Sequence, residues 1–236
     1  MIVDEGGINM VDDWDENQNS TVNPDPTTGV SQFTYPPVAD PDCDGVGMTD
    51  RGEVHLNHGS DTISPGRYEE ITVNPAASLT MEPGLYCITD GDFDISGDLT
   101  AIAVHIYMGP ASGEFNTNAG ATITLVAARE EPTWTCDDPA PATPDICDQA
   151  GLLLHVDELN TNTIHINGGA DTTFIGTFLA PSARIVINGG SETTGEFSSQ
   201  IIGDTVEIEG NADVNIVYDP DLNYTPPIPP QVWLAE

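Results

Sequence analysis

The sequence predicts an all-β fold, a single-stranded parallel β-helix (solenoid) of about eight coils with non-repeat arms at both ends. Two observations support this prediction. One phrase recurs as Ile166–Ala170, Ile187–Ser191 and Ile208–Ala212, with 21 residues between successive copies. The residues before each copy alternate between apolar and polar types and are rich in Val, Ile and Thr, which is typical of strands. No window carries an apolar stripe at helical spacing, and 23 Gly and 19 Pro interrupt the chain.

The same phrase can be followed upstream, which places its anchors at positions 57, 74, 96, 118, 167, 188 and 209. Only the 49-residue gap between Asn118 and Asn167 is much longer than the other spacings between anchors. We interpret this gap as one disguised repeat plus an insertion in the Pro- and Cys-rich stretch at about 130–150. Each unit then holds three short strands and pairs with the next unit at about 4.8 Å.

Stacking of such units assigns a role to the repeated residues. Ile166, Ile187 and Ile208 should lie on top of one another in the core. The residue after each Ile, most often Asn, is expected to be a turn residue, since Asn tolerates positive φ and can hydrogen-bond the neighbouring turn.

The chain divides into three parts. Residues 1–50 form a non-repeat, acidic N-terminal arm that is expected to cap one end of the solenoid or to pack along its side. Residues 51–218 form the β-helix, and residues 219–236 form a Pro-rich C-terminal arm. A Pro-rich arm is extended and stiff, and its apolar residues Ile228, Trp233 and Leu234 are suited to docking on the chain itself or on a neighbouring subunit.

The charge of the chain is strongly negative. There are 39 Asp and Glu against four Arg and no Lys, which gives a net charge of -35. Repulsion therefore disfavours binding to nucleic acid or to an anionic polysaccharide. Two explanations remain, solubility in salty surroundings or coordination of calcium by some of the carboxylates.

The four cysteines predict two disulfides and an oxidising, extracellular location. We expect Cys136 to pair with Cys147 across the insertion, and Cys43 with Cys87 to tie the N-terminal arm to the early coils. The sequence contains no run of the roughly 20 apolar residues that a membrane-spanning helix needs. Its acidic start differs from a signal peptide, so the chain is expected to be a processed form or a part of a longer anchored protein.

One acidic cluster has the spacing of a calcium loop. Asp40, Asp42 and Asp44 precede Gly45 in a D-x-D-x-D-G pattern, although Arg51 stands where an EF-hand has its closing acid. Calcium is therefore the one ion that the sequence suggests, and no cofactor is required. Two glycosylation sequons begin at Asn19 and Asn223.

An enzyme has to be considered, because many parallel β-helices act on polysaccharides. A lyase acting on acidic sugars needs Arg or Lys, which are scarce here. A hydrolase needs two carboxylates across a groove, and nothing in the sequence marks such a pair. The threonines in 171–173 and 192–194 resemble those of flat ice-binding faces, but the sequence has no regular Thr-x-Thr column.

Several phrases resemble the extracellular module of TadG-like proteins, bacterial surface proteins associated with tight-adherence (Flp-type) pili. The phrases, which lie within residues 60–218, are Pro83–Cys87, Ala150–Leu154, Asn162–Ala170, Gly176–Ala183, Ile187–Gly190 and Ile202–Ile208. The resemblance implies an exported, non-catalytic β-helical module at a bacterial or archaeal cell surface.

The sequence therefore predicts a structural or adhesive surface protein that assembles with copies of itself into a filament, through end-to-end or arm-mediated contacts. The alternatives are a glycan-active enzyme, a hydrolase rather than a lyase, and a calcium-dependent adhesin module.

Overall fold

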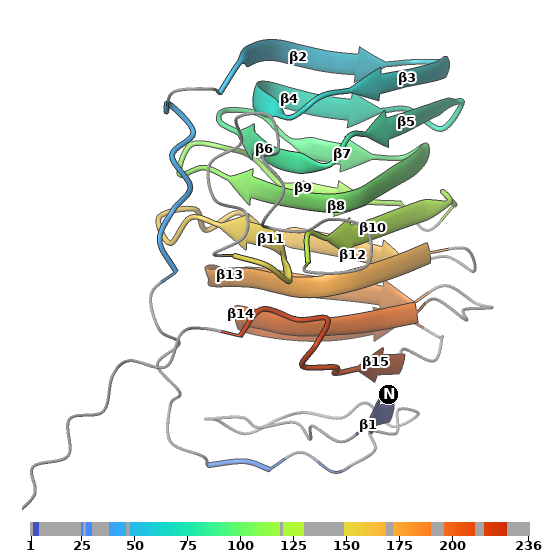
Figure 1. The fold of residues 1–236 in the computed structure, drawn as a ribbon. Helices are drawn as coiled ribbons and strands as arrows, with labels where there is room; N and C mark the ends of the chain where they lie inside the picture. Colours follow the sequence, from blue (N-terminus) through green and yellow to red (C-terminus); the bar gives the residue numbers. More distant parts are fainter. Residues whose placement is uncertain are drawn as a thin grey trace, which may run out of the picture.

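The computed structural model (Figure 1) describes residues 2–4, 25, 27–29, 38–45, 48–118, 120–129, 149–168, 172–189, 196–210 and 215–225. These residues form an all-β parallel solenoid of about six turns, and none of them is helical. The strands belong to one sheet, and each strand pair in it is parallel. The predicted fold class is confirmed.

The strands of the described residues are β1 (Ile2–Asp4), β2 (Asp50–Leu56), β3 (Gly59–Ile63), β4 (Gly66–Val73), β5 (Ala77–Met81), β6 (Gly84–Ile88), β7 (Phe93–Ile95), β8 (Asp98–Met108), β9 (Phe115–Thr117), β10 (Ile123–Ala127), β11 (Leu152–Val156), β12 (Ile164–Gly168), β13 (Thr172–Gly189), β14 (Glu196–Gly210) and β15 (Asn215–Val217).

Strand pairing arranges the turns into three faces. Face A contains β2, most of β4, β7, β9, β12 and the second halves of β13 and β14. Face B contains β3, β5, β10, β15 and the first halves of β8, β13 and β14. Face C contains β6, β11, the start of β4, the second half of β8 and the middle of β13 and β14.

The prediction of eight coils is wrong, because the 49-residue gap holds one turn and not two. β9 pairs directly with β12, with Phe115 opposite Ile164. On face C, β8 likewise pairs directly with β11, with Ile106 opposite Leu154. No disguised repeat can lie between strands that are already neighbours. The extra residues are therefore an insertion within one turn, between β10 and β11.

The recurring isoleucines stack as predicted. Ile166 lies opposite Ile187, and Ile187 lies opposite Ile208. Ile166 and Ile187 are fully buried, whereas Ile208 is 41% exposed because it belongs to the last strand of face A.

The asparagines after these isoleucines lie in strands, so their predicted place in turns is wrong. Asn167 belongs to β12 and Asn188 to β13. Their side chains do link neighbouring turns. The amide Nδ2 of Asn188 donates to Oδ1 of Asn167 at 2.8 Å, and Nδ2 of Asn167 donates to Oδ1 of Asn116 at 3.2 Å. Nδ2 of Asn167 also donates to the backbone carbonyl of Thr117. Since the amide side chains satisfy one another from turn to turn, they form a ladder along the rod.

Face B carries a threonine column that the sequence does not reveal. The five aligned residues are Thr62, Thr80, Thr100, Thr124 and Thr173. Among these five residues only Thr124 belongs to a Thr-x-Thr pattern, with Thr122 directly before β10. β-Branched residues fit the half-exposed outer surface of a strand, and register alone aligns them here.

The N-terminal arm contacts the solenoid at two places. β1 pairs with β15 at the end of the rod opposite β2. Residues 38–45 and 48–49, which we call the strap, run along the outside of face C and lead into β2 at the other end (Figure 1). The chain therefore spans the length of the rod before its first turn begins.

Candidate functional site: the strap and the cleft beside it

The strap is attached to face C by a covalent bond. Cys43 forms a disulfide with Cys87 of β6, with 6.0 Å between the two Cα atoms. This confirms the predicted pairing, and Cys136 and Cys147 lie outside the described residues. Cys87 is fully buried in a small cluster with Leu85 and Tyr107, against which Met48 of the strap packs.

An ion-pair network holds the strap next to β4. Nη1 of Arg67 lies 2.6 Å from Oδ1 of Asp44, and its Nη2 lies 2.8 Å from Oδ2 of Asp50. Hydrogen bonding between Arg67 and Asp50 lowers the pKa of this carboxyl group and raises the pKa of the guanidinium. Because these groups are exposed, the network contributes little to stability and mainly fixes the position of the strap.

A second polar cluster lies under the strap on the outer side of β8 and β11. Oη of Tyr107 donates to Oδ2 of Asp157 at 2.7 Å. The ring of His155 contacts the edge of Tyr107 at 5.3 Å, and its Nε2 lies 3.6 Å from Oδ1 of Asp40 in the strap. Burial lowers the pKa of His155 to about 4. Burial and the nearby charge of Asp157 raise the pKa of Asp40.

His105 completes this cluster without any hydrogen bond. Its ring stacks on His155 at 6.1 Å, it is 1% exposed, and neither ring nitrogen has a partner. Burial lowers the pKa of His105 to about 3, so the ring is neutral at pH 7. The two histidines therefore act as packing groups at neutral pH.

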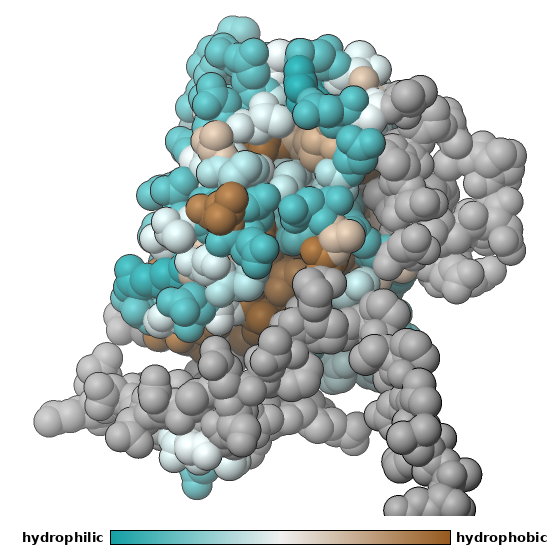
Figure 2. Space-filling view, turned by 90° about the vertical axis from the view of Figure 1, so that its left-hand side faces the viewer, coloured by the Kyte–Doolittle hydropathy of each residue, from teal (hydrophilic) through white to brown (hydrophobic). Residues whose placement is uncertain are grey.

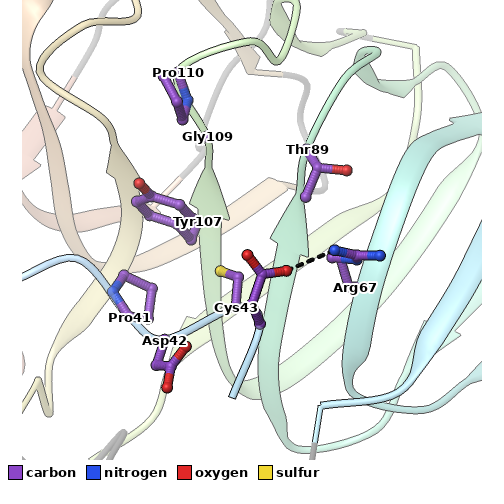
Figure 3. A pocket seen from close by; sticks show the side chains of 9 residues that line it. Pro41, Asp42, Cys43, Arg67, Thr89, Tyr107, Gly109 and Pro110 are labelled. Atoms are coloured by element: carbon purple, nitrogen blue, oxygen red, sulfur yellow. Dashed lines mark hydrogen bonds and ion pairs between the residues drawn. The ribbon is translucent and has the colours of Figure 1, made fainter.

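A cleft of about 400 Å³ opens between the strap and the ends of β6 and β8 (Figure 3). It is lined by Pro41, Asp42, Cys43, Asp44, Arg67, Thr89, Tyr107, Gly109 and Pro110.

The polar groups in this cleft are mostly engaged with one another. Arg67 and Asp44 form an ion pair, and Tyr107 donates its hydroxyl proton to Asp157. A glycosidase needs two carboxylates on opposite sides of the sugar. Only Asp42 among the lining carboxylates is left, so this cleft does not assemble the pair that a hydrolase requires.

The carboxylates of the predicted calcium loop point to different partners. Asp44 binds Arg67, whereas Asp40 lies beside His155. Within the described residues no group of three or more His, Cys, Asp or Glu side chains is placed to hold a metal ion. Calcium binding by Asp40, Asp42 and Asp44 therefore stays a prediction that would require this loop to rearrange.

Asn223 has a structural role in the folded chain. It is 5% exposed, its Oδ1 accepts from the backbone N–H of Gln200 at 2.6 Å, and its Nδ2 donates to the carbonyl of Asp219 at 2.9 Å. An amide that is engaged on both sides is not accessible for glycosylation. The other sequon, at Asn19, lies outside the described residues, as do Ile228, Trp233 and Leu234.

The start of the C-terminal arm packs on face C, close to the start of the strap. Tyr224 joins Leu152 and Leu179 in a hydrophobic cluster, with Val38 and Ile202 partly buried against it. Figure 2 shows the side of the molecule along which the strap runs, hydrophilic over most of its upper part and hydrophobic in a strip lower down. Both arms therefore use face C.

Sequence reasoning missed the cluster under the strap. His105 and Tyr107 alternate with core residues in one strand, but Asp157 and His155 lie about 50 residues further along the chain. Since the insertion hides the register between β8 and β11, no spacing in the sequence brings these residues together.

No family model, curated protein or solved structure matches this chain. In the described part of the chain there is also no helix of the length and hydrophobicity needed to cross a membrane.

Proposed function

We propose that this chain is a non-catalytic structural or adhesive module of a bacterial or archaeal cell surface, exported from the cell, that assembles end to end with copies of itself. Its phrases resemble the extracellular module of TadG-like proteins. The Cys43–Cys87 bridge favours an oxidising location outside the cytoplasm. The cleft beside the strap lacks the pair of free carboxylates that a glycan hydrolase would use, which favours a structural role over the enzyme alternative.

The observation that carries this proposal is that no strand among the described residues covers the outer edge of face A at either end. At one end β2 pairs with β4, and no other described strand pairs with β2. Val54 and Leu56 of β2 point towards the core and are only partly buried. A long unpaired edge with apolar side chains is a template for pairing with another chain.

The other end of face A has the same properties. Residues 205–210 of β14 pair with β13, and no described strand pairs with their other edge. Val206 and Ile208, which occupy core positions, are 42% and 41% exposed. A different surface at each end gives a head-to-tail contact that does not close, and repetition of such a contact gives a filament.

Electron microscopy and analytical ultracentrifugation of the full chain over a range of concentrations test this proposal. We expect concentration-dependent filaments, and we expect Ile208→Lys to abolish them by placing a charge in the contact. Ile102→Lys is the matched control, because Ile102 is 43% exposed but lies in the middle of the rod on face B.

Two results would overturn the proposal. A chain that stays monomeric at every concentration and salt, with or without β1 paired to β15, lacks the end-to-end contact. Filaments that persist in Ile208→Lys do not use this contact. Turnover on a panel of glycans would instead support the enzyme alternative. A melting transition that shifts on chelation of calcium would favour the calcium-dependent adhesin.

A further inference from the structure

We propose that successive copies stack in one defined register, with the second half of β14 of one copy pairing in parallel with β2 of the next, so that Val206 lies opposite Val54 and Ile208 opposite Leu56. We also propose that β1 competes with this contact. Both parts rest on the proposed function and specify the contact that it requires.

The core is continuous along face A. One column of inward-facing residues passes through every turn of face A, and it consists of Val54, Ile71, Phe93, Phe115, Ile164, Ile185 and Val206. A second column begins at Leu56 and ends at Ile208. Their interior members are fully buried, whereas the members at the two ends are not. Stacking of two copies would extend both columns without a change of spacing.

Other registers of β14 against β2 fit less well. A slip by one residue would bring inward side chains opposite outward ones. A slip by two residues in one direction would place Val206 opposite Gly52, which has no side chain, and in the other direction would place Ile208 opposite His58. Only the proposed register brings apolar residues together at both positions.

The amide ladder has a polarity. Nδ2 of Asn188 and Nδ2 of Asn167 donate to the preceding turn, as Nδ2 of Asn74 does to Oδ1 of Asn57 at 2.8 Å. Asn57 stands on the first turn, and no hydrogen bond engages its own Nδ2 within the described residues. At the other end of face A, Glu209 stands opposite Asn188. A carboxylate accepts hydrogen bonds, so Glu209 of one copy can accept a hydrogen bond from the free Nδ2 of Asn57 in the next copy.

The neighbouring outward positions are compatible with this contact. The register places His55 opposite Glu207, which Arg184 already holds through its Nε at 2.8 Å. His55 lies 3.3 Å from Glu53 and 3.8 Å from Glu70, so its imidazole would stand among three carboxylates. The net charge of -35 opposes association of copies, and salt that screens this repulsion should promote it.

β1 occupies a position on face B that the next copy would need. It pairs with β15, with Val3 opposite Ile216, and so lies one strand beyond the last turn (Figure 1). In a head-to-tail stack this is the position that β3 of the next copy would take, since β3 follows β2 directly in the same turn. A strand of three residues is short enough to be displaced. Assembly should therefore require β1 to leave β15.

Disulfide trapping in the full chain tests the register. In the variant His55→Cys/Glu207→Cys, the two new thiols face each other across the contact, where neighbouring strands lie about 4.8 Å apart and a disulfide can form. We expect a ladder of covalent oligomers on non-reducing gels. The control Glu53→Cys/Glu209→Cys offsets the thiols by four residues, about 13 Å along the strand, and should give at least ~10-fold less cross-linked product.

The part played by β1 is tested in the same assay. Val3→Pro removes a backbone donor from this strand, whereas Val3→Ala leaves the backbone unchanged. We expect Val3→Pro to raise the yield of the cross-linked ladder several-fold and Val3→Ala to leave it as it is.

The outcomes separate the proposals. Filaments that form but do not cross-link through positions 55 and 207 would overturn the register while the proposed function stands. A ladder yield that Val3→Pro lowers or leaves unchanged would overturn the competition by β1. If neither the parent chain nor Val3→Pro associates at any concentration or salt, the proposed function fails together with the register.

Discussion

Removal of the Cys43–Cys87 bridge should cost the folded chain about 4 kcal/mol of stability. The bridge joins residues that are 44 positions apart, so it closes a long loop that contains the first two turns and the start of the third. In the chain-entropy model, a cross-link across about 45 residues restricts the unfolded chain by about 13 cal/mol/K, which corresponds to this free energy at 25 °C. The double variant Cys43→Ala/Cys87→Ala makes the change without leaving a free thiol.

Guanidinium denaturation is the appropriate assay, followed by far-ultraviolet circular dichroism for the strands and by near-ultraviolet circular dichroism for buried tyrosines such as Tyr107. The three tryptophans, Trp14, Trp134 and Trp233, lie outside the described residues, so the tyrosines, whose place in the rod is known, are the chosen probe. The single variant Asp44→Ala is the control, because it removes an exposed ion pair of the strap and should cost less than about 1 kcal/mol. A loss below about 1 kcal/mol in the double variant would refute the argument from loop closure.

Three further predictions concern single positions. Asn167→Ala should cost about 1–3 kcal/mol by leaving ladder groups unpaired, measured as a lower denaturation midpoint; no change would mean that water replaces the amide. Gly151→Ala should detach the start of the C-terminal arm, because its φ is +84° and a Cβ would lie 2.6 Å from the backbone nitrogen of Tyr224; faster proteolysis at residues 219–225 would report this, and unchanged cleavage would contradict it. Burial lowers the pKa of His155 from the usual 6.5 to about 4 in the folded chain. Between these two pH values the unfolded chain therefore binds more protons at this histidine than the folded chain does. Stability should therefore be full above pH 6.5 and fall by about 3 kcal/mol towards pH 4. In pH-dependent melting, His155→Phe should make this fall smaller, and an unchanged fall would contradict the role of His155.

The repeat made the fold predictable from the sequence. The insertion at about 130–150 prevented a correct prediction of the number of turns. Three copies spaced 21 residues apart fix the stacking of Ile166, Ile187 and Ile208, because turns of equal length keep the same phase. Turns of unequal length break that link between spacing and position. The spacing between Asn118 and Asn167 therefore predicts two units, although β9 and β12 are direct neighbours.

The same limitation applies to the features that the sequence did not reveal. The threonines of face B stand at irregular intervals in the chain, yet strand register aligns them. The pairing of Cys43 with Cys87 was predictable because few cysteines allow few choices. The separation of Asp40 from Asp44 was not predictable, because it depends on the residues that the strap contacts on face C, namely His155 and Arg67.

The strap also determines how the rod would respond to force. Between Cys43 and Asp50 the chain runs outside the stack, from its attachment on β6 to the first strand of the rod. When the ends of the rod are pulled apart, the load on the first turns is shared between inter-strand hydrogen bonds and a covalent path through the Cys43–Cys87 bridge. The hydrogen bonds can open one at a time, but the covalent path cannot lengthen beyond the contour of a few residues. The first turns are therefore tethered, and under tension they would stay attached to the rod until the disulfide is reduced.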